Sequence, residues 1–153
     1  MADLQFSVSG VAKSHSEIAM NVRGFEFSID EPVSLGGTNA GPNPVELVLS
    51  ALAGCINVVV HLVAQERDVQ IDGLRITVSG ALDPRNFMGD ASGPRPGFLS
   101  IELVAEVDSP ASDEEIDQIL AIAETRCPVA DNLGATTPVL LRRAAVERAS
   151  VEA

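Results

Sequence analysis

The feature that most constrains the fold of this chain is one long apolar segment, which begins at Asn43-Pro44 and continues to about Arg67. Asn is a favoured N-cap residue and Pro suits the first turn of a helix, so the segment predicts a helix over 43–67. Its polar residues fall near one stripe at helical periodicity: Ser50, Asn57, His61, Gln65 and Asp68. The other positions are apolar nearly all round, which predicts a central helix buried on most faces.

This helix belongs to a chain of 153 residues, enough for one domain with a hydrophobic core. We predict a single domain over 1–153. The longest apolar run, Val45–Ala64, is interrupted by polar residues that include Glu46 and His61, whereas a membrane span needs about 20 predominantly apolar residues. We therefore interpret the segment as a core helix and expect no membrane partner.

Strand patterns flank the helix on both sides. Alternating runs predict strands at 4–11, 17–22, 24–29, 74–82 and 98–107. The segment 139–146 is a last strand or a helix, and Pro138 and the β-branched flank favour the strand. Arg23-Gly24 separates the second and third runs and predicts a hairpin. Ser112-Asp113-Glu114-Glu115 predicts a capped second helix, and a short helical turn follows Cys127. The order of these elements predicts an α+β domain.

Charge limits the partners. The chain has 22 acidic and 10 basic residues, a formal net charge of −12, and no Trp or Tyr. An acidic surface repels phosphate backbones and anionic membranes, and stacking platforms for single strands need aromatic side chains. We therefore expect no nucleic-acid partner.

The start of the chain bears on the compartment. The first ten residues lack the basic start of a secretory signal, so we expect a cytoplasmic protein. In the cytoplasm a catalytic disulfide is more typical than a permanent one.

The two cysteines, Cys55 and Cys127, are the best candidates for chemistry. A thiol becomes a nucleophile only as the thiolate. Cys127 precedes Pro128 near the start of a short helix, where free N–H groups favour negative charge. Cys55 lies mid-helix in apolar surroundings, which raise the pKa of a thiol unless a cation is near. On these residues alone, a redox pair and two small core residues remain alternatives.

Other residue types suggest no bound cofactor. Neither His15 nor His61 has a neighbouring ligand at metal-site spacing, and the cysteines do not form a close pair in sequence. No Lys-Ser or Lys-Thr follows the glycines at 36, 37 and 41, so they do not match a phosphate loop. We expect neither a metal nor another cofactor.

Three stretches of the chain resemble the OsmC/Ohr superfamily, which contains osmotically inducible protein C and organic hydroperoxide resistance proteins. They are Leu35-Gly36-Gly37, the run from Gly41-Pro42-Asn43-Pro44 to Ala53-Gly54-Cys55, and Arg126-Cys127-Pro128-Val129-Ala130-Asp131-Asn132-Leu133. The resemblance implies an OsmC-like α+β fold with an antiparallel sheet packed on a long central helix. It also implies an intertwined homodimer with active sites near the subunit interface.

The peroxidase members of the superfamily imply a role for each cysteine. In them, the helix cysteine attacks an organic hydroperoxide and becomes a sulfenic acid, the Cys-Pro cysteine resolves it as a disulfide, and a thiol reductant restores both. By motif, Cys55 would be the peroxidatic residue and Cys127 the resolving one. The alternative is an OsmC-like stress-associated or small-molecule-binding protein with little or no peroxidase turnover.

The resemblance also suggests partners for the Cys55 thiol. The peroxidase members carry Glu directly after the Asn-Pro pair; here Val45 takes that place and the next residue is Glu46. They hold the thiolate with an Arg from the N-terminal region, where Arg23 is the only Arg that precedes the helix. Glu46 and Arg23 are therefore candidate site residues, with Arg126 as the second candidate for the cation.

Overall fold

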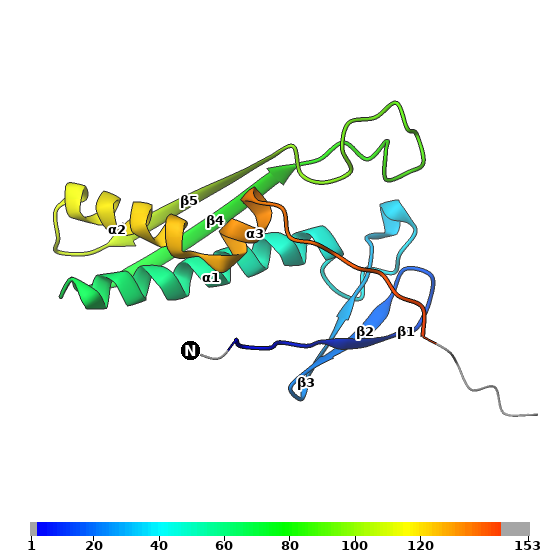
Figure 1. The fold of residues 1–153 in the computed structure, drawn as a ribbon, viewed down its shortest axis with the longest axis horizontal. Coiled ribbons are helices and arrows are strands. Elements are labelled where there is room, and N and C mark those ends of the chain that lie inside the picture. Colours follow the sequence, from blue (N-terminus) through cyan, green and yellow to red (C-terminus); the bar gives the residue numbers. More distant parts are fainter. Residues whose placement is uncertain (1–2, 145–153) are drawn as a thin grey trace, which may run out of the picture.

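The computed structural model of the protein describes residues 3–144 (Figure 1). Its elements, in chain order, are the strands β1 (Ser9–Ala12), β2 (Ile18–Val22) and β3 (Phe25–Ile29), a 3-10 turn (Val33–Leu35), α1 (Pro44–Glu66), the strands β4 (Gly73–Ala81) and β5 (Ser100–Asp108), α2 (Asp113–Arg126) and α3 (Pro128–Gly134). β1, β2 and β3 form one antiparallel sheet, and β4 and β5 form another. The predicted α+β class is confirmed.

α1 begins where the sequence predicts, with Asn43 as its N-cap and Pro44 in its first turn. The Asn43 side chain accepts a hydrogen bond from the N–H of Glu46 (2.9 Å), and the Glu46 carboxylate accepts one from the N–H of Asn43 (2.8 Å). Pro44 occupies the first helical position. By length and apolar composition alone, α1 could also cross a membrane, but the core helix of a soluble protein has the same length and composition.

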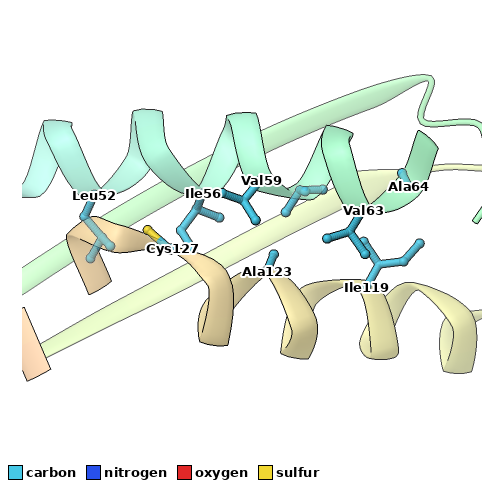
Figure 2. Close-up of a cluster of buried hydrophobic side chains, with 9 residues drawn as sticks. Leu52, Ile56, Val59, Val63, Ala64, Ile119, Ala123 and Cys127 are labelled. Atoms are coloured by element: carbon cyan, nitrogen blue, oxygen red, sulfur yellow. The ribbon is translucent and has the colours of Figure 1, made fainter. Parts of the chain in front are cut away.

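The core lies where α1, α2 and the β4–β5 sheet meet. Figure 2 shows Ile119 and Ala123 of α2 facing the buried side of α1. The buried core residues are Leu52, Ile56, Val59, Val60, Val63, Ala64, Ile119, Ala123 and Cys127. Half-buried side chains of the sheet pack against them: Leu74, Ile76, Val78, Ile101 and Leu103. The core is therefore built from aliphatic side chains.

The N-terminal sheet lies to one side of the helices, near the start of α1 (Figure 1). Its β2–β3 hairpin has the predicted turn at Arg23 and Gly24, with φ of 53° and 91°. Positive φ at both central residues is the requirement of a type I′ turn, whose twist matches the flanking strands. Phe25 and Phe27 of β3 are exposed, so the described protomer leaves apolar surface of this sheet uncovered.

The prediction of a last strand is wrong for this protomer. Residues 139–144 are irregular, and residues 145 and 146 lie outside the described part of the chain. A strand needs a neighbouring edge for its backbone hydrogen bonds, and within the described residues no strand pairs with this segment. The segment is nevertheless apolar. Without a strand neighbour, its side chains Val139 and Leu141 are almost fully exposed, at 93% and 96%.

One buried carboxylate, Asp30, holds the loop between β3 and α1. Its Oδ2 accepts hydrogen bonds from the N–H and hydroxyl of Thr38 (2.8 and 2.7 Å) and from the N–H of Ala40 (3.1 Å), and its Oδ1 accepts from the N–H of Glu31 (2.9 Å). The Thr38 hydroxyl, followed by the backbone donors, holds the pKa of Asp30 well below its usual range although burial acts in the opposite direction. This clamp fixes the approach of the chain to α1.

Two glycines let the same loop pack tightly. A Cβ at position 37 would overlap the carbonyl of Glu31, and a Cβ at position 41 would overlap the carbonyl of Ser28. Both neighbours are backbone atoms, which cannot rotate away as a flexible side chain can. Gly37 and Gly41 are therefore required by close backbone approach, which explains the glycine-rich pattern without a phosphate ligand.

We expect Asp30→Asn to lower the midpoint of thermal unfolding by several degrees, because the neutral amide leaves the buried donors of Thr38 and Ala40 poorly satisfied. Because folding lowers the pKa of Asp30, its contribution is present above its unfolded-state pKa, about 3.9, and is lost as pH falls below that value. Wild-type stability should therefore fall more steeply in acid than that of Asp30→Asn. Asp90→Asn, at an exposed carboxylate bonded to Ser92, is the matched control and should change little. Equal acid sensitivity of wild type and Asp30→Asn would contradict the clamp.

Candidate redox site

The fold brings the two cysteines into contact. Cys55 lies in the middle of α1, and Cys127 lies at the junction of α2 and α3. Both are free thiols, and their Sγ atoms are 2.7 Å apart. An S–S bond is about 2.05 Å long, so a disulfide requires only a small movement. Figure 2 shows Cys127 reaching toward α1 between Leu52 and Ile56.

The local sequence explains the position of Cys127. α2 ends there because Pro128 lacks an N–H and clashes with a continuing helix, while the same proline suits the first turn of α3. Cys127 has extended backbone angles, and its Sγ accepts a hydrogen bond from the N–H of Ala130 (3.3 Å). The predicted placement of Cys127 at a helix start is confirmed, with the sulfur itself acting as the N-cap.

Burial distinguishes the two thiols. Cys127 is fully buried, whereas Cys55 is partly exposed. Burial raises the pKa of the Cys55 thiol, and hydrogen bonding with the Cys127 thiol raises it further. The backbone N–H of Val129, in the first turn of α3, acts in the opposite direction. In the reduced protomer Cys55 is therefore held as a thiol, accessible but weakly ionised.

The described contacts place neither candidate arginine on this thiol. Arg23 lies in the hairpin turn, with its guanidinium 5.9 Å from the centre of the Phe25 ring. Arg126 forms a two-point ion pair with Glu66 (2.6 and 3.0 Å), about three turns beyond Cys55 along α1. Neither guanidinium contributes to the pKa of Cys55 in the protomer. The role of Arg23 at the site stays a prediction.

Glu46 serves the helix start in the protomer. Its carboxylate is bonded to the N–H of Asn43, as part of the capping box. At about 100° per residue, Glu46 and Cys55 project from α1 about 180° apart. Glu46 instead lines a cavity of about 320 Å³ beside Ile76 and Val78 of β4. Within one protomer, the structure thus brings Cys55 and Cys127 together and leaves Glu46 on the opposite side of the helix.

A long apolar groove borders the cysteine pair on its buried side. It has a volume of about 940 Å³ and lies between β5, the first half of α1 and the helices α2 and α3. Leu52 and Ile56, which flank Cys127, line the groove, as does Ala130, which bonds to its sulfur. Sequence reasoning missed this groove because its walls come from segments far apart in the chain. The only local sequence signal near the groove was the helix start at Cys127-Pro128.

The site contains no grouping suited to a metal ion among the residues that the structure describes. Within 3–144, no set of three or more His, Cys, Asp or Glu side chains is placed to hold one. The site does contain two adjacent free thiols, Cys55 and Cys127. Such a pair can exchange two electrons by opening and closing one disulfide.

Comparison with known proteins shows the family of the chain. The OsmC-like protein family matches residues 37–142. The chain belongs to the OsmC-like family. A hydroperoxide reductase from Mycoplasma pneumoniae is 25% identical over 134 residues, which cover 86% of this chain and 88% of that protein.

Solved structures show the same fold. An OsmC-like protein from Mycoplasma pneumoniae aligns with a TM-score of 0.74 and 25% identity, over 87% of this chain and 89% of that one. An OsmC-like protein of unknown function from Vibrio cholerae aligns with a TM-score of 0.71 and 13% identity, over 85% of this chain and 94% of that one. The predicted superfamily and its fold are confirmed.

The pKa of Cys55 generates a direct prediction. We expect the pH midpoint for iodoacetamide alkylation of Cys55, followed by mass spectrometry, to lie above the usual thiol value of about 8.5. Cys127→Ala should lower this midpoint because it removes the neighbouring thiol, whereas Cys127→Ser keeps a hydrogen-bonding group and should shift it less. A wild-type midpoint below the usual value would show that a positive group outside the described contacts acts on Cys55.

Proposed function

We propose that this OsmC-like protein is a thiol-dependent peroxidase that reduces organic hydroperoxides. The observation that carries the proposal is the 2.7 Å separation of two free thiols of unequal exposure, Cys55 and Cys127. The partly exposed thiol can meet a substrate, and the buried one can meet only its neighbour. The 25% identical relative that bears the name hydroperoxide reductase supports the same chemistry.

The proposed cycle balances with one hydroperoxide and one dithiol reductant. The Cys55 thiolate attacks the distal oxygen of ROOH, the O–O bond breaks, and the products are Cys55 sulfenic acid and the alcohol ROH. The Cys127 thiol then attacks the Cys55 sulfur, forming the S–S bond and releasing water. A dithiol reductant finally supplies two electrons and two protons, and leaves as its own disulfide.

The geometry suits capture of the sulfenic acid. Further oxidation to sulfinic acid is irreversible without a dedicated enzyme, so a peroxidase of this kind benefits from a resolving thiol already in contact. Cys127 is held in that position by the α3 start and the surrounding core. Because the pKa of Cys55 is raised, attack in the protomer requires a deprotonation that becomes easier as pH rises.

We expect Cys55→Ser to abolish consumption of cumene hydroperoxide. Cys127→Ser should allow one turnover and then accumulate Cys55 sulfinic acid, because nothing captures the sulfenic acid. Wild type treated with one equivalent of peroxide should lose both free thiols and show an intramolecular Cys55–Cys127 bond by mass spectrometry. If both thiols remain free after this treatment, the binding-protein alternative is favoured. If Cys127→Ser blocks the first turnover and Cys55→Ser does not, then Cys127 is the peroxidatic residue and Cys55 the resolving one.

We also propose that the working form is a homodimer in the cytoplasm, with a hydroperoxide and a thiol reductant as partners and with neither nucleic acid nor membrane. The apolar side of α1 next to Cys55 supports the dimer, since Val58 and Leu62 are 63% and 43% exposed. Gly54 lies on this side, where an added Cβ would meet no atom of the described chain. Glycine inside a helix costs about 1 kcal/mol relative to alanine, which a closely packed second copy would explain.

The proposed dimer can be tested by its mass in solution and by a substitution on the apolar side of α1. Light scattering at micromolar concentration should give twice the chain mass, for an interface of more than about 2,000 Å². Val58→Glu should weaken the dimer by placing a charge on the apolar side of α1. Asn57→Glu, which adds the same charge one position away on the polar stripe, is the control. A wild-type monomer under these conditions would rule the dimer out.

A further inference from the structure

A two-point ion pair joins the last residues of α1 and α2. Glu66 ends α1 and Arg126 ends α2, and the guanidinium of Arg126 donates to both oxygens of the Glu66 carboxylate, at 2.6 and 3.0 Å. Two such bonds fix the orientation of both groups as well as the distance between them. The residue after Arg126 is Cys127, so the pair holds the chain directly before the buried thiol.

Other contacts hold the end of α2 less firmly. The N–H of Cys127 reaches the carbonyl of Glu124 at 3.4 Å, which is long for a backbone hydrogen bond. The buried contact beside it consists of aliphatic side chains, with Ala123 facing α1 (Figure 2). Burial of apolar surface is non-directional. Packing therefore keeps α2 against α1, but the register at the Cys127 end depends on a directional contact as well.

The place of the ion pair along α2 distinguishes it from the second polar contact of the two helices. Arg67, the C-cap residue of α1, donates to Gln118 at 2.9 Å and approaches Glu115 at 3.8 Å. Both partners lie in the first half of α2, well before Cys127. Within residues 3–144, the charged contact between α1 and the cysteine end of α2 is therefore the one made by Arg126.

Exposure limits what this pair contributes to overall stability. The side chains of Arg126 and Glu66 are 40% and 48% exposed, and ion pairs exposed to this degree contribute little to the free energy of unfolding. Position matters far more for a reaction between two groups, because a displacement of about 1 Å can lower its rate about 100-fold. The pair can thus act on the reaction of Cys127 while the stability of the fold stays nearly unchanged.

We propose that Glu66 and Arg126 are positioning residues, which hold Cys127 against Cys55 so that the sulfenic acid is captured before a second hydroperoxide reaches it. The proposal rests on the peroxidase function proposed above. The Cys55 sulfenic acid has two fates. Attack by the Cys127 thiol forms the S–S bond and releases water, whereas a second ROOH oxidises the sulfur to sulfinic acid and leaves as ROH. By keeping the thiols in contact, the ion pair favours the first fate.

The test is a single turnover of the reduced protein over a range of cumene hydroperoxide concentrations, without reductant. Mass spectrometry after an acid quench gives the ratio of Cys55 sulfinic acid to Cys55–Cys127 disulfide. Arg126→Ala and Glu66→Gln should each reach equal amounts of the two products at a peroxide concentration at least about tenfold lower than wild type, because capture is slower. The rate of the first step, the loss of the Cys55 thiol, should not change.

Two control variants show whether the effect belongs to this pair. Arg67→Ala removes the other polar contact between the helices, and Arg75→Ala removes an exposed ion pair with Glu106 (3.4 Å) on the β4–β5 sheet. Both should leave the product ratio within about twofold of wild type. Circular dichroism and the thermal midpoint check that all variants remain folded. An equal rise of sulfinic acid in Arg67→Ala, or no rise in Arg126→Ala and Glu66→Gln, would overturn the proposal.

An exchange of the two charges separates positioning from a direct effect of the Arg126 charge on the thiols. Glu66→Arg with Arg126→Glu rebuilds the ion pair in the opposite sense and should restore most of the wild-type product ratio. Arg126→Lys keeps the charge but loses the two-point bond, so it should fall between wild type and Arg126→Ala. The pH midpoint of Cys55 alkylation should be the same in Arg126→Ala as in wild type. A raised midpoint, or no restoration by the exchange, would overturn the positioning role.

The products also separate this inference from the peroxidase function on which it rests. Wild type that forms neither disulfide nor sulfinic acid would overturn both. Wild type that forms the disulfide, with a product ratio equal to that of the Glu66 and Arg126 variants, would overturn the positioning role and leave the peroxidase function standing.

Discussion

The packing of α2 and α3 against one side of α1 is the interaction on which the rest of the site depends. It brings residues that are far apart in sequence to a sulfur–sulfur distance of 2.7 Å, and its buried contact consists of aliphatic side chains. Ile119 and Ala123 set the separation of the two long helices, and Pro128 ends α2 at the level of Cys55. A change that moved α2 by part of a turn would separate the thiols without touching either one.

The elements set by local patterns could be predicted from the sequence. Asn43-Pro44 marks the start of α1, Arg23-Gly24 marks a hairpin turn, and Ser112 marks the start of α2, because each of these signals acts within a few residues. The strands β4 and β5 follow from alternation alone. The resemblance to the OsmC/Ohr superfamily added what local patterns lack, namely that the two cysteines meet.

The failures have a common physical origin. The segment 139–144 has a strand pattern and forms no strand in the protomer, because a strand depends on an edge that propensity does not specify. The groove along β5 was missed because its walls come from four elements. The Asn43-x-x-Glu46 spacing is that of a capping box, but the resemblance drew attention to the thiol instead; the bond from the N–H of Asn43 accounts for the Glu46 carboxylate without the thiol. Each failure concerns a contact between distant parts of the chain or a competition for one side chain.

The electrostatics of Cys55 link its chemistry to assembly. Burial already raises the pKa of this thiol in the protomer, so a second copy that covered the apolar side of α1 with apolar groups alone would raise it further. Thiolate formation in a dimer therefore requires that the second copy also bring positive charge or leave a polar passage. Arg23 is suited to bring the positive charge, because in the described structure its guanidinium lies over the Phe25 ring rather than against a carboxylate. It also lies at the tip of a sheet that the protomer leaves largely uncovered, so delivery between subunits is compatible with its absence from Cys55 within one protomer.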